Sequence, residues 1–170
     1  MIHVDAYLPR TKINVSHPYD IIKVQKIILH DPGNNWTAEQ LIQYFNHPRN
    51  VRYGSYHDVL EGDTVYHLID HKKRAFHAGT KEESELWRDL PRQGWQNAYS
   101  LGICMTRPGW CLETLASYVE GLCLLHNLDP FTDVLCHYQI ASEKTDPIKL
   151  QDNQQLGKLI ALIALGQGET

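Results

Sequence analysis

The chain has 170 residues, of which 42% are hydrophobic and 21% charged, a composition typical of a folded globular domain with its own core. Its formal net charge of −4 argues against a nucleic-acid-binding groove, which needs an excess of Lys and Arg, and provides no attraction to an anionic lipid surface. No apolar stretch reaches the roughly 18 residues of a membrane span, and residues 1–10 lack the pattern of a secretion signal.

We therefore expect a single domain over residues 1–170, with a core from about 21 to 166 and an N-terminal arm of residues 1–20. We also expect synthesis in the cytoplasm, no membrane insertion and no nucleic-acid partner.

The first predicted elements are a strand and a helix. The run KVQKIILHD (23–31) is β-branched and apolar, and it stops at His30 before a Pro-Gly turn. A short helix over 37–45 follows, because Thr37 and Gln40 have the spacing of a capping box.

A hairpin is predicted next. Residues 55–60 and 64–69 flank the turn residues Glu-Gly-Asp. Strict alternation would place Tyr56 and Asp58 on one face of this hairpin and His57 on the other. The polar segment 81–97 is predicted to be a long loop of unassigned role.

The second half of the chain predicts two more strands and two helices. The strands cover 100–106 and 132–138, and an apolar stripe predicts a helix from Leu112 that covers one face of the sheet. The last helix covers 153–165 and ends at Gly166. The order β-α-β-β-β-α-β-α predicts an α/β fold with a central mixed β-sheet flanked by helices.

The four cysteines lie inside apolar runs and form no Cys-x-x-Cys pair. We expect free thiols, with Cys136 buried and without an assigned role.

Two histidines end predicted strands. His30 and His137 close apolar runs, and Asp146 follows in the loop KTDP. Two imidazoles and one carboxylate are a common ligand set for catalytic zinc. Each histidine taken alone is more often a hydrogen-bonded core residue, and Lys144 is either a stabiliser of an oxyanion or a solvated surface charge. Spacing alone therefore leaves a zinc peptidase of unknown substrate open.

Five segments in the same order carry a family resemblance. They are IILHDPGN (27–34), SYHDVLEGDTVYHLI (55–69), RAFHAG (74–79), SLGICM (100–105) and HYQIASEKTDP (137–147). With these segments the chain resembles the zinc-dependent N-acetylmuramoyl-L-alanine amidases of the amidase-2 and peptidoglycan-recognition-protein fold, which include many phage endolysins.

The resemblance implies a zinc site and its catalytic residues. It makes His30, His137 and Asp146 the ligands of one Zn²⁺ per chain. It gives Lys144 the role of stabilising the transition state and Tyr56 that of contacting the water at the metal.

Two further residues are expected to bind substrate. His77 matches a residue of the substrate groove in this family. Trp36 follows the His30 turn and is a weaker candidate, because a loop tryptophan either packs against the protein or contacts glycan and peptide.

One departure from the family pattern concerns Cys104. Recycling-type amidases of this fold carry a Glu at the matching position, so this chain lacks that acid. Its absence favours a catalytic arrangement based on Tyr56 and Lys144 over one with a glutamate general base, and it argues against the recycling role.

The remaining histidines are expected to be structural or superficial. We expect His57 to be a structural residue and His126 to be a cation at a helix end. His3 and His17 belong to the N-terminal arm and have no expected role. His47, His67 and His71 lie in polar or turn surroundings and are expected at the surface.

The expected function is hydrolysis of the amide between N-acetylmuramic acid and L-alanine in peptidoglycan, as the catalytic domain of a phage or prophage endolysin. Because a chain of net charge −4 is attracted little to an anionic wall, we also expect a separate wall-binding module. The alternatives are a non-catalytic peptidoglycan-binding module of the same fold and a cytoplasmic muropeptide-recycling amidase.

Overall fold

A computed structural model describes residues 1–9, 15–20, 23–47, 54–79 and 96–168. The strands are β1 (Ile2–Asp5), β2 (Val15–Asp20), β3 (Lys26–His30), β4 (Asp58–Glu61), β5 (Thr64–His67), β6 (Lys73–Ala75), β7 (Ser100–Met105) and β8 (Val134–Cys136). The helices are α1 (Ala38–Asn46), α2 (Leu112–His126), α3 (Pro130–Asp133), α4 (His137–Ile140) and α5 (Asn153–Gln167), with the 3₁₀ turns η2 (Gln96–Ala98) and η3 (Ile148–Leu150).

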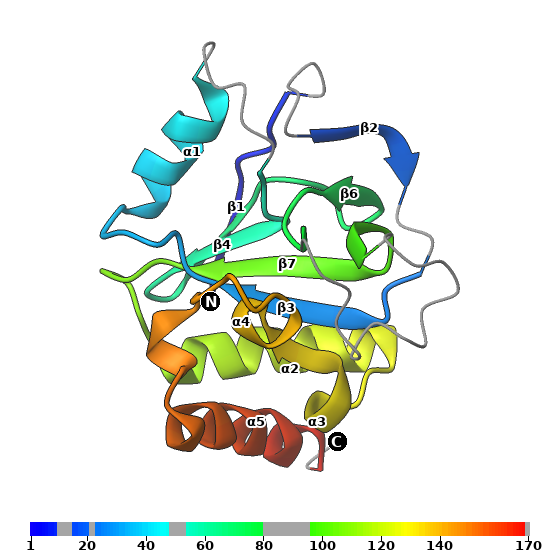
Figure 1. Cartoon of the computed structure of the whole chain (residues 1–170), viewed down its shortest axis with the longest axis vertical. Helices are drawn as coiled ribbons and strands as arrows, with labels where there is room; N and C mark the ends of the chain where they lie inside the picture. Colours follow the sequence, from blue (N-terminus) through cyan, green and yellow to red (C-terminus); the bar gives the residue numbers. More distant parts are fainter. Residues whose placement is uncertain (10–14, 21–22, 48–53, 80–95, 169–170) are drawn as a thin grey trace.

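The centre of the molecule is a mixed sheet with helices on both faces (Figure 1). Its strand order is β1-β5-β4-β7-β3-β8; β4, β7, β3 and β8 are parallel to one another, and β5 is antiparallel to β4. Strands β2 and β6 form a separate antiparallel pair. The predicted fold class is therefore confirmed.

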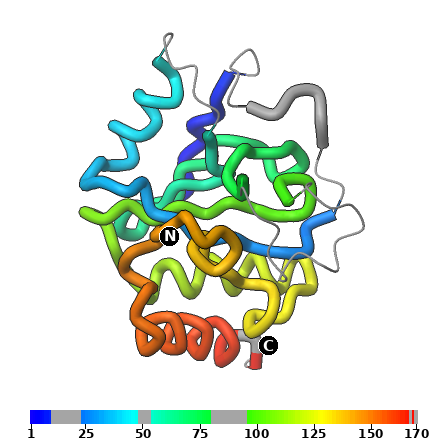
Figure 2. The backbone as a smooth tube through the Cα atoms, viewed as in Figure 1, coloured from blue at the N-terminus to red at the C-terminus, as the bar shows by residue number. Residues whose placement is uncertain are grey.

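Alternation along the central strands sorts their side chains between two layers. Ile27 and Leu29 of β3 point into the core beneath helix α2, whereas Ile28 belongs to a core cluster on the opposite face. Helix α5 packs against α2, and the two run side by side in the tube of Figure 2. Helix α1 packs on the other face, where His30 also lies.

Local sequence signals set several element boundaries. Thr37 and Gln40 form the predicted reciprocal capping box at the start of α1. The apolar stripe of α2 is buried against the sheet, as predicted. All four cysteines are free thiols, also as predicted. None of the described helices combines the length and apolar character needed to cross a bilayer.

Residues 2–5, expected to be part of an arm outside the core, instead form an edge strand. β1 pairs in parallel with β5 over four residues, although its own side chains are exposed. Backbone hydrogen bonds, which leave no periodic signal of burial, hold this strand in place.

The predicted strand over 132–138 is shorter than expected. Only Val134–Cys136 are extended, because α3 precedes them and His137 already begins α4. The predicted loop 81–97 lies outside the described residues except for its last two residues, which belong to η2.

The expectation that Tyr56 and Asp58 share a face is wrong. The hydroxyl of Tyr118 on α2 donates to the carboxylate of Asp58 over 2.8 Å, whereas Tyr56 packs with α1 on the opposite side. Regular strand geometry begins only at Asp58, so alternation does not extend back to Tyr56.

Candidate metal centre

Three side chains from distant parts of the chain meet above the end of β3. Nδ1 of His30 lies 2.9 Å from Oδ2 of Asp146, and Nδ1 of His137 lies 3.0 Å from Oδ1 of the same carboxylate. Both histidines are buried, and the carboxylate is partly buried. These are the three residues that the sequence analysis proposed as metal ligands.

The sheet explains why the histidines meet. β3 and β8 are parallel neighbours, so His30 at the end of one and His137 just after the other lie at the same edge of the sheet. Asp146 is brought back to them by the loop after α4, where the backbone N–H of Tyr138 donates to the carbonyl of Asp146 over 3.0 Å.

Burial and the neighbouring side chains together set the pKa values of His30 and Asp146. Burial, together with the neighbouring His137, lowers the pKa of His30 to about 4. Burial by itself would raise the pKa of Asp146, but hydrogen bonds from His137 and His30 outweigh burial and hold that pKa below its usual range. The site thus places two imidazole nitrogens and a carboxylate next to one another.

This donor set fits a zinc ion. Two imidazole nitrogens and a carboxylate oxygen are a known catalytic zinc set, and donors at about 2.0–2.2 Å from a tetrahedral ion lie roughly 3.3–3.6 Å apart. The separations of 2.9, 3.0 and 3.1 Å are a few tenths of an ångström shorter, so small outward shifts of these side chains would admit the ion. In addition, Nε2 of His137 is buried and has no hydrogen-bond partner among the described residues.

Behind His30 lies His77. Nε2 of His30 and Nδ1 of His77 are 3.2 Å apart, and Nε2 of His77 is 3.3 Å from the carbonyl of Ser100. Burial lowers the pKa of His77 well below its usual value, so this imidazole is neutral. His77 lines the cavity, as a groove residue should, but it also supports the proposed ligand His30.

The backbone of β7 leaves room for His77 only because residue 102 is glycine. A Cβ built on Gly102 would stand 2.4 Å from Cγ of His77. Asn97 holds the same segment from the other side, since its Oδ1 accepts from the backbone N–H groups of His77 and Ala78.

Tyr56 lies beside His30. Its ring centroid is 5.0 Å from that of His30 and 5.8 Å from that of Phe45. Burial raises the pKa of the Tyr56 phenol well above its usual value, so the hydroxyl remains a proton donor over the accessible pH range.

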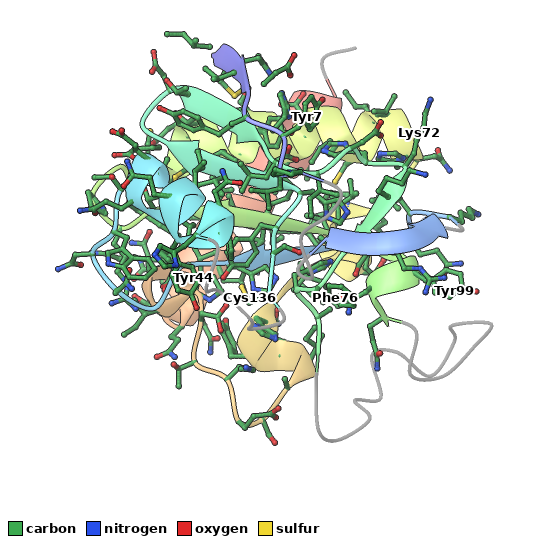
Figure 3. The ribbon with its side chains drawn as sticks, turned by 90° about the horizontal axis from the view of Figure 1, so that it is seen from above. Tyr7, Tyr44, Lys72, Phe76, Tyr99 and Cys136 are labelled. Atoms are coloured by element: carbon green, nitrogen blue, oxygen red, sulfur yellow. The ribbon has the colours of Figure 1, made fainter. Side chains whose placement is uncertain are left out.

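A cavity of about 590 Å³ opens over these groups. All seven residues predicted for the site line it: His30, Trp36, Tyr56, His77, His137, Lys144 and Asp146. Lys144 is exposed, and Trp36 is tilted against Tyr44 with the ring centroids 5.1 Å apart. Two other residues that line this cavity, Tyr44 of α1 and Phe76 just after β6, are labelled in Figure 3.

Sequence reasoning missed Asp31. This buried carboxylate accepts from the backbone N–H of Gly33 over 2.7 Å and of Ile148 over 2.7 Å, and it pairs with Nη2 of Arg107 at 3.1 Å. It therefore ties the turn after His30 to the loop that carries Asp146. The sequence signal, an Asp next to a strand-ending His, was used only to mark a turn.

Cys104 lies opposite His30 in the β3–β7 ladder. Burial raises the pKa of its thiol well above the usual value, so this position supplies no charged group.

A second cluster of histidines surrounds Asp58. His67 Nδ1 and His71 Nε2 donate to the two carboxylate oxygens over 2.7 and 2.6 Å. These separations are those of short hydrogen bonds to a carboxylate. Hydrogen bonds from the two imidazoles outweigh burial and lower the pKa of Asp58 to about 2.

This cluster corrects several expectations about histidines. His67 and His71 were expected at the surface but are half-buried partners of Asp58. His3 was expected to have no role, yet its Nδ1 lies 3.0 Å from Nε2 of His67. Burial lowers the pKa of His126, which disfavours the cation expected there.

His57 is the structural residue that was expected. The backbone N–H of Gly102 donates to its Nδ1 over 2.9 Å, and its Nε2 donates to the carbonyl of Lys73 over 2.9 Å. The side chain of His17 lies outside the described part of the chain.

Comparison with known proteins identifies a family and several structures with this fold. Residues 21–149 match the family model described as N-acetylmuramoyl-L-alanine amidase. No curated protein matches the chain in sequence.

Several solved structures share the fold. A mutant endolysin from Bacillus subtilis is 21% identical, with a TM-score of 0.74 over 96% of this chain and 99% of that one. The catalytic domain of XlyA is 20% identical, with a TM-score of 0.74 and the same coverage. AmiD from E. coli, in complex with the substrate anhydro-N-acetylmuramic acid-L-Ala-D-gamma-Glu-L-Lys, is 19% identical, with a TM-score of 0.59 over 80% of this chain and 57% of AmiD.

Proposed function

The chain belongs to the N-acetylmuramoyl-L-alanine amidase family, and on that premise we propose that it hydrolyses peptidoglycan with a zinc ion held by His30, His137 and Asp146. The bond cleaved is the amide between the lactyl group of N-acetylmuramic acid and the L-alanine of the stem peptide. Water adds to the amide carbonyl and the C–N bond breaks, which yields a lactyl carboxylate and a free alanine amino group.

The observation that carries this proposal is the convergence of three donor groups on one point in the cavity wall. Nδ1 of His30 and Nδ1 of His137 both lie within 3.1 Å of the carboxylate of Asp146. Zinc bound there supplies a Lewis acid that polarises a carbonyl and activates water near neutral pH.

The residues around the metal centre position the reacting groups. His77 holds the ring of His30 through the contact between Nε2 of His30 and Nδ1 of His77, in the place of the carboxylate or carbonyl that more often orients a ligand histidine. The protonated phenol of Tyr56 donates a hydrogen bond that orients the attacking water. The ammonium group of Lys144, on the exposed loop at the rim, stabilises the oxyanion as the carbonyl becomes tetrahedral.

The shape of the cavity supports a glycopeptide substrate. Its lining combines the metal donors with aromatic side chains, including Trp36, Tyr44 and Phe76. Aromatic faces of this kind pack against sugar rings and peptide. The AmiD substrate, a muramic acid bearing L-Ala-D-γ-Glu-L-Lys, has this composition.

We propose that the biological role is that of an endolysin catalytic domain, which is made in the cytoplasm and then acts on the cell wall, alongside a separate wall-binding module. The similarity in fold to an endolysin from Bacillus subtilis supports this role. Recycling-type amidases of the fold that this chain resembles carry a Glu at the position that matches Cys104. Burial raises the pKa of the Cys104 thiol, so this position supplies no acid group, which argues against a recycling role.

The test combines metal content with two activities. Purified native protein and the His137→Ala variant are assayed for bound zinc, for clearing of Gram-positive cell walls, and for release of alanine amino groups, with and without a chelator. We expect about one zinc per native chain and loss of both activities after chelation or substitution.

The other outcomes are distinct. Bound zinc with cleavage of soluble muropeptides but not of walls would indicate a recycling enzyme. New reducing sugar ends in place of amino groups would mean that a different bond is cleaved. Full activity in the His137→Ala variant would refute the ligand set.

A further inference from the structure

A second cavity lies on the far side of the turn that follows His30. Its volume is about 560 Å³, and it is lined by Asn35, Arg107, Pro108, Ile148 and Lys149. Asn34 and Trp36, the residues on either side of Asn35, line the active-site cavity instead. One turn thus separates the two cavities, and a peptide that extends over this turn passes from the first to the second.

The second cavity carries two cationic side chains. Arg107 is anchored by one contact, in which Nη2 donates to Oδ1 of Asp31 over 3.1 Å, and the side chain is 24% exposed. A guanidinium has five N–H donors, so this contact leaves donors for a second acceptor. Lys149 is exposed at the same cavity, three residues after Asp146.

The negative charge of Asp31 does not cancel this pair of cations. Asp31 is buried, and its oxygens also accept from the backbone N–H groups of Gly33 and Ile148. Among the described residues, the lining of this cavity thus contains two cationic side chains and no carboxylate, in a chain whose overall charge is −4. Arg side chains held in this way bind carboxylates through paired N–H groups.

The proposed substrate offers a free carboxylate close to the scissile bond. A D-Glu that is linked through its γ-carboxyl keeps its α-carboxylate free, and this residue follows the L-Ala whose amide is cleaved. One intervening residue spans about 3.6 Å, so the carboxylate lies on the order of 7 Å from the scissile bond. Asp31, which anchors Arg107, is the residue directly after the ligand His30.

We propose that Arg107 and Lys149 form a subsite for the free α-carboxylate of the second stem-peptide residue. The inference rests on the proposed amidase function and adds a substrate preference to it. Stem peptides with D-γ-glutamate are cleaved faster than those in which the same carboxyl is amidated, because the amide carries no charge for the two cations.

The test uses two soluble substrates that differ only in this group: N-acetylmuramoyl-L-Ala-D-γ-Glu-L-Lys and its D-isoglutamine counterpart. We expect the native zinc-loaded chain to show a kcat/KM about tenfold higher for the free carboxylate, the size expected of one charged hydrogen bond. The preference should fall toward one in Lys149→Gln and in Arg107→Gln, mainly through KM for the carboxylate substrate.

Two further variants separate recognition from folding. Arg107→Lys keeps the charge but loses the paired donors, so it should retain part of the preference. Lys158→Gln removes an exposed cation of α5, which lies 3.8 Å from Glu113, and should leave the preference unchanged. Because each variant serves as its own reference with the amidated substrate, loss of overall stability cannot imitate a change in the ratio.

The outcomes distinguish the two proposals. Equal cleavage of the two substrates by the native chain would overturn the subsite and leave the amidase function intact. A native preference that survives in both glutamine variants would show that other residues read the carboxylate. Cleavage of neither substrate, with zinc bound, would overturn both proposals.

Discussion

At the scale of single residues, several buried polar side chains are each held in place by a partner from another part of the chain. His30 is positioned by His77, and His77 has room only because Gly102 has no side chain. Asp58 is held in the same way by His67 and His71. Each pair joins residues on different elements, so a change at one position acts through its partner.

Gly102→Ala should disturb the proposed metal centre indirectly, through His77. Its Cβ would lie 2.4 Å from Cγ of His77, so the ring must move away from His30. We expect a destabilisation of about 1–3 kcal/mol in urea unfolding, together with weaker zinc binding.

Gly121→Ala is the matched control. Gly121 lies inside α2, and a Cβ there meets no atom within 4 Å. This substitution should stabilise the chain by about 0.5–1 kcal/mol and leave zinc affinity unchanged. Equal effects of the two substitutions would contradict the role assigned to Gly102.

The Asp58 cluster predicts a pH-dependent stability. The hydrogen bond to Asp58 raises the pKa of His67, so protonated His67 stabilises the folded state. This contribution is fully present below the unfolded pKa of about 6.5 and is lost as the pH rises through the folded pKa. The free energy of unfolding in urea should therefore decrease, as the pH rises above about 6.5, more in the native chain than in His67→Gln.

The same pH dependence of the unfolding free energy in the native chain and in His67→Gln would contradict this interpretation. On the acid side, the pKa of Asp58 is lowered to about 2, so its contribution is present above about 4 and is lost only as the pH falls through 2.

At the scale of elements, the site is assembled from the ends of strands and held by one buried carboxylate. β3 and β8 deliver His30 and His137 to one edge of the sheet. Asp146 belongs to a loop without regular structure, and its position depends on bonds to other elements. Asp31 supplies one of these by accepting from the backbone N–H of Ile148.

Asp31→Asn should loosen the loop of Asp146 while preserving the fold. The amide has one acceptor oxygen in place of two, so one of the backbone N–H groups of Gly33 and Ile148 loses its acceptor, and the charge opposite Arg107 disappears. We expect zinc affinity to decrease about tenfold, measured by competition with a chromophoric chelator.

Asp63→Asn serves as the comparison, because Asp63 is an exposed turn residue between β4 and β5. If both variants bind zinc as tightly as the native chain, Asp31 does not position the metal loop.

At the scale of the whole molecule, stability and metal binding are separable. The core between the sheet and α2 is apolar and is distinct from the cluster under α1 that borders the site. Burial of this size is enough for a 170-residue chain to fold without a metal.

Removal of zinc should therefore abolish cleavage but leave the chain folded. Ligand linkage predicts a decrease in Tm on the order of 5–10 °C with chelator, with a cooperative transition retained. Circular dichroism melts with and without chelator would measure this decrease in Tm. The His137→Ala variant should have the same Tm with and without chelator. An unfolded native chain after chelation would mean that the metal is needed for the fold.

The sequence alone determined the features that depend on neighbouring residues. Periodicity placed the central strands and α2, the capping box placed the start of α1, and five ordered segments pointed to the amidase family. The seven proposed site residues also came from these local patterns, and all of them line one cavity.

Only the tertiary structure decided which distant groups meet. Asp31 bonds to Arg107 and Ile148, which are 76 and 117 residues away in the chain, and no local pattern records such a pairing. The face occupied by Tyr56, the edge strand β1 and the partners of Asp58 likewise followed from strand register and packing. Periodicity and capping act over a few residues, whereas the partner of a buried charge depends on how the sheet brings remote segments together.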